Sequence, residues 1–99
     1  MRFFLSFTPT AKACLKELKD SRQLRKRFKA VSKTLKLLQE NPRHPGLQTH
    51  EFYSLQGPDG EKVFEAYAEQ DTPAAYRIFF CYGRHQRGEI VIIAVTPHP

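Results

Sequence analysis

The strongest periodic signal in this chain is a run of apolar residues separated by alternating steps of four and three. The run consists of Leu24, Phe28, Val31, Leu35 and Leu38. This spacing places the side chains on one face of an α-helix. Asp20 and Ser21 are expected to end the helix before it and to cap this one. Asn41 is expected to end it, because the residue before a proline is driven out of the α region and Pro42 follows.

A shorter apolar stripe of helical spacing precedes that run. It consists of Ala11, Cys14, Leu15 and Leu18. Thr8 offers a hydroxyl N-cap and Pro9 suits the first helical position, where its missing N–H costs nothing. The residues before them, Arg2 to Phe7, are short, aromatic and apolar, which predicts a first strand. The two stripes together predict an antiparallel helical hairpin that packs on something apolar.

The second half of the chain alternates strand-like runs with turn residues. Four strands are predicted: Glu51 to Leu55, Lys62 to Glu69, Ala75 to Tyr82 and Glu89 to Val95. The segment 57–60, Gly-Pro-Asp-Gly, is a strong reverse-turn signal. The run 90–95 is apolar on both faces, so this strand should be central in the sheet. In the strand before position 70, Val63, Glu65, Tyr67 and Glu69 are expected to form a wet face opposite a buried one.

These elements predict a single α+β domain over residues 1–99, in the order β-α-α-β-β-β-β. The helical hairpin should pack on one face of a mainly antiparallel sheet. An apolar content of 40% over 99 residues supports one hydrophobic core that needs no disulfide or metal ion to hold it together. Cys14 and Cys81 are expected to be buried, reduced thiols. The apolar run after Arg2 is too short for a signal peptide or a membrane span, which favours a cytoplasmic protein without membrane contact.

Positive charge is concentrated in the helical half. Between Lys12 and Lys36 stand ten Lys and Arg residues against Glu17 and Asp20, whereas residues 51–89 carry seven acids and four bases. This asymmetry favours a polyanionic or acidic partner for the hairpin. A solvated helix surface is the alternative. The candidate RNA-binding side chains are Lys12, Lys16, Lys19, Arg22, Arg25, Lys26, Lys29, Lys33, Arg84 and Arg87.

Arg77 lies inside an otherwise apolar strand, Tyr-Arg-Ile-Phe-Phe over residues 76–80. A guanidinium there is costly unless it meets an anion. It could form a salt bridge with Glu65 or Glu51 on a neighbouring strand, or it could bind a phosphate on the open face of the sheet. The four histidines lack the spacing of a zinc site, so no metal or cofactor is expected.

His98 follows the last strand, between Pro97 and Pro99. Terminal residues are usually frayed, but two prolines stiffen this segment, so the imidazole can hold a fixed position beside the sheet. An imidazole is suited to moving a proton from a ribose hydroxyl near neutral pH.

The order of these segments resembles the RelE/ParE toxin superfamily. The resemblance rests on the first strand, the basic hairpin ending in Leu-Leu-Gln-Glu-Asn-Pro at 37–42, the Tyr-Arg-Ile strand at 76–78, and the final Ile/Val-rich strand. In its messenger-RNA endonucleases, an arginine on the Tyr-Arg strand and, in one branch, a histidine one residue from the C-terminus act at the site. Arg77 and His98 stand at these positions.

The resemblance implies a toxin that is neutralised by a cognate antitoxin and that cuts messenger RNA on the ribosome. His98 would transfer a proton at the scissile linkage, and Arg77 would stabilise charge on the phosphoryl oxygens. The product would be a 2′,3′-cyclic phosphate, formed without a metal. Basic side chains of the hairpin would contact ribosomal RNA phosphates.

The chain departs from that branch at three positions. Pro45 and Gly46 stand where a catalytic glutamate is usual, and His50 or Glu51 close by could replace it. Thr96 stands where a second arginine is frequent, and Pro99 replaces a terminal aromatic residue. Two further functions therefore stay open. One is gyrase inhibition of the ParE type, and the other is a catalytically inactive member that binds RNA or antitoxin.

Overall fold

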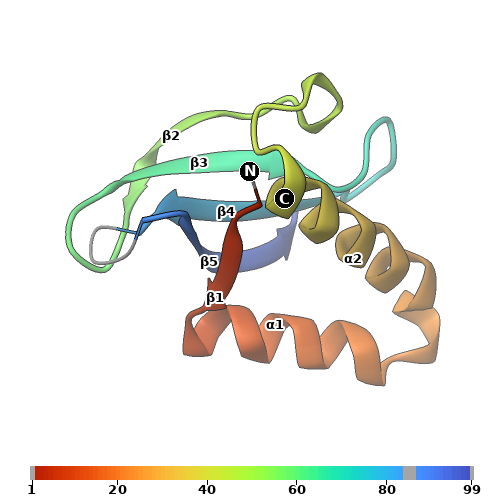
Figure 1. The fold of residues 1–99 in the computed structure, drawn as a ribbon. Coiled ribbons are helices and arrows are strands. Elements are labelled where there is room, and N and C mark those ends of the chain that lie inside the picture. Colours follow the sequence, from red (N-terminus) through yellow and green to blue (C-terminus); the bar gives the residue numbers. More distant parts are fainter. Residues whose placement is uncertain (1, 84–86, 99) are drawn as a thin grey trace.

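The computed structural model describes residues 2–83 and 87–98 and consists of two helices and a five-stranded sheet (Figure 1). The elements are β1 (Phe4–Phe7), α1 (Pro9–Asp20), α2 (Arg25–Glu40), β2 (His50–Gln56), β3 (Lys62–Tyr67), β4 (Tyr76–Tyr82) and β5 (Glu89–Pro97). Short 3₁₀ turns at Arg22–Leu24 and Pro45–Leu47 lie on either side of α2. This is the predicted α+β order.

The sheet has the strand order β1-β5-β4-β3-β2. β1 pairs with β5 in parallel, and the other three pairs are antiparallel. β5 therefore has a neighbour on each side, so the apolar last strand is not an edge strand, although β4 and not β5 holds the middle position that was predicted for it. β1 can lie beside β5 because the helical hairpin carries the chain across the sheet between β1 and the β2–β5 meander.

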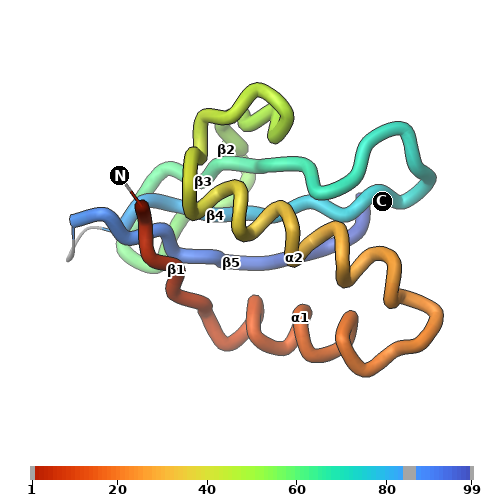
Figure 2. Tube along the Cα trace, turned by 45° about the vertical axis from the view of Figure 1, so that its right-hand side comes forward, coloured from red at the N-terminus to blue at the C-terminus, as the bar shows by residue number. Residues whose placement is uncertain are grey.

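Both helices cover the same face of the sheet, and the core lies between them (Figures 1 and 2). Leu18 of α1, together with Val31 and Leu38 of α2, is at most 1% exposed, and Phe80 and Ile92 beneath them are fully buried. The apolar stripes of the sequence thus form the buried faces of the two helices, as their spacing predicted. Burial of this surface is the main source of stability for such a domain.

The helix ends follow the sequence signals at two places and depart from them at one. The Thr8 hydroxyl accepts a hydrogen bond from Ala11 N–H at 3.1 Å, so the predicted N-cap is confirmed. Asn41 closes α2, as expected. Ser21, however, makes no capping hydrogen bond, and the prediction that it caps the second helix is wrong. The 3₁₀ turn is inserted there, so α2 begins four residues later and Leu24 holds the capping position.

The prediction that β3 has a wet face is also wrong for the first two residues of that face, Val63 and Glu65. Val63 is 1% exposed and Glu65 is 2% exposed, although their side chains point away from the helices. His50 and Phe79 lie opposite Glu65 on the flanking strands β2 and β4. A buried carboxylate is tolerated only where charges and donors surround it, and the next section shows which side chains do so here.

Both cysteines are free thiols, as predicted, and Cys81 is buried. The prediction that Cys14 is buried is wrong, because this side chain packs only partly against the core and is half-buried. Burial, followed by the nearby Glu61, Glu89 and Asp59 carboxylates, raises the pKa of the Cys81 thiol to about 11. Among the described residues, no helix is both long enough and apolar enough to cross a membrane.

Candidate functional site

The helix-free face of the sheet carries the polar side chains that the sequence singled out. Residues directly opposite each other in a ladder project to the same face. His50 lies opposite Glu65. Arg77 lies between Tyr67 of β3 and Thr96 of β5. Since residues two apart on a strand share a face, all of these side chains project from the side of the sheet opposite the helices.

Arg77 and Glu65 form a buried ion pair at the centre of this face. Arg77 Nη1 donates to Glu65 Oε2 at 2.6 Å, and the two side chains are 14% and 3% exposed. The guanidinium carbon also lies 4.9 Å from the ring centre of Phe79 and 5.8 Å from that of Phe52. The salt bridge with Glu65, one of the interpretations that the sequence left open, is therefore confirmed. A phosphate-binding role for Arg77 stays a prediction.

His50 is the second side chain that contacts the Glu65 carboxylate. Its Nε2 lies 2.8 Å from Glu65 Oε1, and its Nδ1 lies 3.2 Å from the Gln48 carbonyl oxygen. Both ring nitrogens therefore face acceptors, and these two contacts orient the imidazole. Half of the His50 side chain is exposed, against 3% for Glu65. His50 is thus the accessible end of the charge cluster.

Tyr67 connects this cluster to a neighbouring hollow. Its hydroxyl donates to Glu65 Oε1 at 3.3 Å, and its ring centre lies 5.8 Å from that of His50. Burial, with the Glu65 carboxylate as the next cause, raises the pKa of the Tyr67 phenol, and Arg77 opposes that shift. The phenol therefore stays protonated well above neutral pH.

His98 lies at the hollow. β5 runs to Pro97, and His98 N–H donates to the Ala75 carbonyl oxygen at 2.8 Å, so the backbone of this residue is fixed beside β4 as expected. The imidazole is exposed. It lines an open hollow of about 540 Å³ together with Tyr67, Gln48 and residues 69–75. Pro99, the second stiffening residue, lies outside the described residues.

The structure brings together some of the predicted catalytic residues and separates others. Arg77 and His98 project from adjacent strands on the same face, but the Arg77 guanidinium contacts Glu65 and does not line the His98 hollow. Glu51 pairs with Phe64, on the alternate register, so it projects to the helix-covered side. Of the two residues that could replace the missing glutamate, only His50 lies on the candidate face.

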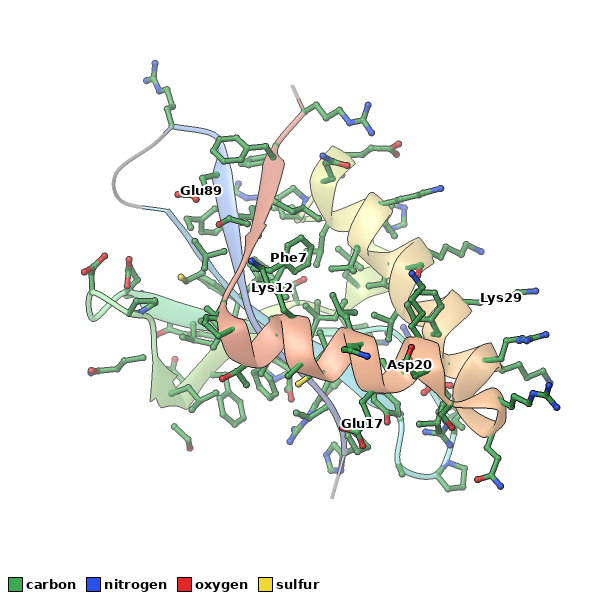
Figure 3. All side chains as sticks on the ribbon, turned by 90° about the horizontal axis from the view of Figure 1, so that it is seen from below. Phe7, Lys12, Glu17, Asp20, Lys29 and Glu89 are labelled. Atoms are coloured by element: carbon green, nitrogen blue, oxygen red, sulfur yellow. The ribbon has the colours of Figure 1, made fainter. Side chains whose placement is uncertain are left out.

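The predicted RNA-binding residues of the hairpin form an exposed basic surface on the other side of the molecule. Figure 3 shows Lys29 extending outward from α2. Lys16 is paired with Asp20 at 2.6 Å, and both are largely exposed, so solvent screens this contact. Arg87 is exposed in the β4–β5 connection, and Arg84 lies outside the described residues. The exposed members on the helices are Lys12, Lys16, Lys19, Arg22, Arg25, Lys26, Lys29 and Lys33.

Arg27 is a basic residue of α2 to which the sequence assigned no role. Its Nη1 donates to the Ala74 carbonyl oxygen at 2.6 Å, and its Nη2 donates to the Pro73 carbonyl oxygen at 3.1 Å. It also lies 3.4 Å from Glu69 and stacks over Tyr76. In the sequence, Arg27 stands four residues before Val31, so it borders the apolar stripe of α2. This position was the available indication that its side chain does not point straight into solvent. Arg27 fixes the β3–β4 loop and is not part of the free basic surface.

Within residues 2–83 and 87–98, no group of three or more His, Cys, Asp or Glu side chains is arranged to hold a metal ion. Comparison of the chain with models of protein families, with curated proteins and with solved structures finds no match in any of the three.

Proposed function

We propose that this chain is the toxin of a toxin–antitoxin pair and that it cuts messenger RNA on the ribosome without a metal ion. One observation carries the proposal. His98 is an exposed imidazole whose backbone is fixed by Ala75, and it lines a hollow next to the His50–Glu65–Arg77 charge cluster. A positioned proton-transfer group beside a source of positive charge is what cleavage of a phosphodiester needs.

In the proposed reaction, His98 takes the proton of a ribose 2′-hydroxyl. The 2′-oxygen forms a bond to phosphorus, the bond from phosphorus to the 5′-oxygen breaks, and the product is a 2′,3′-cyclic phosphate. The leaving 5′-oxygen takes a proton from water, and the His98 imidazolium afterwards releases its added proton to water, which restores the imidazole.

Arg77 and His50 act in this proposal as fixed charges. Both contact the single carboxylate of Glu65, at 2.6 Å from Arg77 and 2.8 Å from His50, so they are held beside the hollow. The guanidinium is a permanent positive charge at this position and attracts an anionic strand. Phe52 and Phe79, which flank the guanidinium, add apolar surface against which bases can stack.

The position of the basic helices supports a large RNA partner. The helices cover one side of the sheet and the candidate site lies on the other, in a domain that measures 37 × 28 × 26 Å. A short strand cannot reach both surfaces at once, whereas a ribosome can present RNA phosphates to the helices and messenger RNA to the sheet. An antitoxin that neutralises the protein would cover one of these surfaces.

The test uses the purified protein in a translating extract with mapping of transcript 5′ ends. We expect new ends with the wild type. We expect a rate lower by about 100-fold or more with His98→Asn, because general acid–base groups typically contribute this much. His44→Asn is the matched control: it also replaces an exposed imidazole, and it keeps an acceptor for Gly46 N–H. Equal cleavage by the wild type and His98→Asn would remove His98 from the site.

A second function is favoured by a specific observation, the commitment of Arg77 to Glu65. A guanidinium that is 14% exposed and 2.6 Å from a carboxylate is poorly placed to meet a phosphate. The chain would then bind ribosomal RNA without cutting it. Sedimentation of the protein with ribosomes separates the two functions. Binding alone predicts that the wild type and His98→Asn sediment equally and that transcripts remain intact.

A further inference from the structure

The hollow beside His98 is built from three segments that are distant in sequence. Gln48 comes from the turn before β2, residues 69–75 form the β3–β4 loop, and His98 follows β5. Gln70 Nε2 donates to the Gly46 carbonyl oxygen at 2.8 Å, which ties two of these segments together. The volume of about 540 Å³ falls within the usual range of small-molecule sites, about 300–1,000 Å³.

The chemistry of the walls suits the base of a nucleotide and not the phosphate attached to it. No Lys or Arg is among the described residues that line the hollow, whereas Glu69 and Asp71 are. Glu69 is engaged by Arg27 and by Tyr76 N–H, but Asp71 is exposed. A hollow with an accessible carboxylate favours a ligand group that donates hydrogen bonds and carries no negative charge.

The remaining walls supply an aromatic surface and amide groups. Tyr67 forms one side, and the side chains of Gln48 and Gln70 stand on others. Single-stranded RNA bases are bound in this way, stacked on aromatic or imidazole rings and hydrogen-bonded along their edges. A carboxylate on such an edge accepts from an exocyclic amino group, as Asp and Glu do with N4 of cytosine.

The loop that forms the wall is held in an unfavourable backbone conformation. Asp71 and Ala74 have φ angles of 56° and 53°, a region that residues with a Cβ seldom adopt. Arg27 holds the loop from α2 through the Ala74 and Pro73 carbonyl oxygens. The surrounding structure thus over-determines this conformation, as is common at ligand-binding loops.

We propose that this hollow binds the base of one RNA nucleotide next to the cleaved linkage and prefers bases that carry an exocyclic amino group. Asp71 accepts from that amino group, Tyr67 stacks on the base, and Arg27 is a positioning residue for the loop. The inference rests on the proposed function only in taking RNA as the ligand. It does not require cleavage.

The test is titration of isotope-labelled protein with the four nucleoside 5′-monophosphates, followed by amide chemical shifts. We expect CMP, AMP and GMP to shift the signals of Tyr67, His98 and residues 70–75. We expect UMP, which has no amino group, to bind about tenfold more weakly, the lower range for one specific base contact. Equal affinity for all four nucleotides, or shifts confined to the helices, would overturn the proposal.

Variants separate the role of the loop from general loss of the fold. Asp71→Asn should abolish the preference for amino-bearing bases, because the new amide can both donate and accept. Glu40→Gln, which removes a similarly exposed carboxylate from α2, should leave it unchanged. Arg27→Ala should weaken binding of all four nucleotides, and Arg27→Lys, which cannot reach both carbonyl oxygens, should restore little. Retention of the preference in Asp71→Asn would contradict the assigned contact.

The two proposals fail in different ways. If CMP shifts the hollow but transcripts stay intact in a translating extract, the base site stands and the nuclease function does not. If transcripts are cut but no nucleotide shifts the signals of residues 70–75, the nuclease function stands and the base site does not.

Discussion

The two faces of the sheet solve the problem of burial in opposite ways. On the helix-covered face, Ile78, Phe80 and Ile92 are fully buried against apolar helix side chains, and no charge is involved. On the other face, Glu65 is nearly as buried, at 2% exposure, but its neighbours are Arg77 and His50. The first face is held by surface removed from water, which is non-directional. The second depends on particular partners at particular distances.

This difference indicates which face is available for function. Burying charges usually contributes little net stability, because desolvation offsets their attraction. A domain that needed only a second apolar layer would be served by apolar residues at positions 65 and 77. The retained cluster, with His50 half exposed at its edge, is instead suited to meet a charged ligand.

The largest expected effect comes from breaking the ion pair on one side only. Glu65→Leu should lower the free energy of unfolding by about 3–5 kcal/mol, because it leaves Arg77 buried without an anion. The double variant Glu65→Leu/Arg77→Met should lie within about 1 kcal/mol of the wild type or above it, since apolar replacements of a whole buried pair are often neutral. Urea denaturation of the wild type, Glu65→Leu, Arg77→Met and the double variant measures both.

The comparison of the double variant with its two single variants shows whether Glu65 and Arg77 stabilise the fold as a pair. A double variant that is as unstable as the sum of its two single variants would mean that the pair is not the unit of stability on this face. Phe52 and Phe79, which flank the guanidinium, would then have to be the main packing contacts.

A somewhat smaller loss of stability is expected from a substitution on the helix-covered face, where no second substitution is expected to restore it. Leu38→Ala should cost about 2–5 kcal/mol, because Leu38 is fully buried and the cavity cannot be filled by relaxation alone. Leu55→Ala is the matched control, since Leu55 on β2 is 40% exposed and should change stability by less than about 0.5 kcal/mol. A small loss in Leu38→Ala, measured by thermal unfolding, would show that α2 is not essential to the core.

How far the sequence predicts the structure differs between the same two faces. The helical stripes and the doubly apolar strand 90–95 predict the helix-covered core, because period and composition are local properties. Glu65 was expected on a wet face, since alternation along β3 cannot show that Arg77 and His50 cover it from neighbouring strands. The sequence offered Glu65 and Glu51 as partners of Arg77, and only the register of β2 and β3 decides between them.

The hollow beside His98 could not be predicted at all from the sequence. It is assembled from Gln48, residues 69–75 and His98, whose proximity depends on the return of β5 beside β4. Arg27 was one of ten basic residues in the helical half, and its distinct role follows from the distance between α2 and the β3–β4 loop. Contacts of this range are set by tertiary structure, which hydrophobic period does not encode.

The smallest expected effect is on the pH dependence of stability. It shows whether water is excluded from the helix-free face at the end away from His98. Cys81 projects to that face and is fully buried, with its Sγ close to Gly57 in the β2–β3 turn. Burial, and then neighbouring carboxylates, raises the pKa of this thiol from 9.0 to about 11. The native state thus holds the proton more tightly than the unfolded chain. Its contribution to stability is complete below pH 9 and is lost as the pH rises toward 11.

A pKa raised from 9.0 to about 11 corresponds to at most about 2.7 kcal/mol over the whole pH range, so the wild type should lose stability more steeply than Cys81→Ala between pH 9 and 10.5. Urea denaturation at several pH values measures the two slopes. Cys14→Ala, which removes the half-buried thiol, should follow the wild type. Parallel slopes for the wild type and Cys81→Ala would mean that water reaches Cys81. The helix-free face would then be open to water along its whole length, and only the helix-covered face would be a dry core.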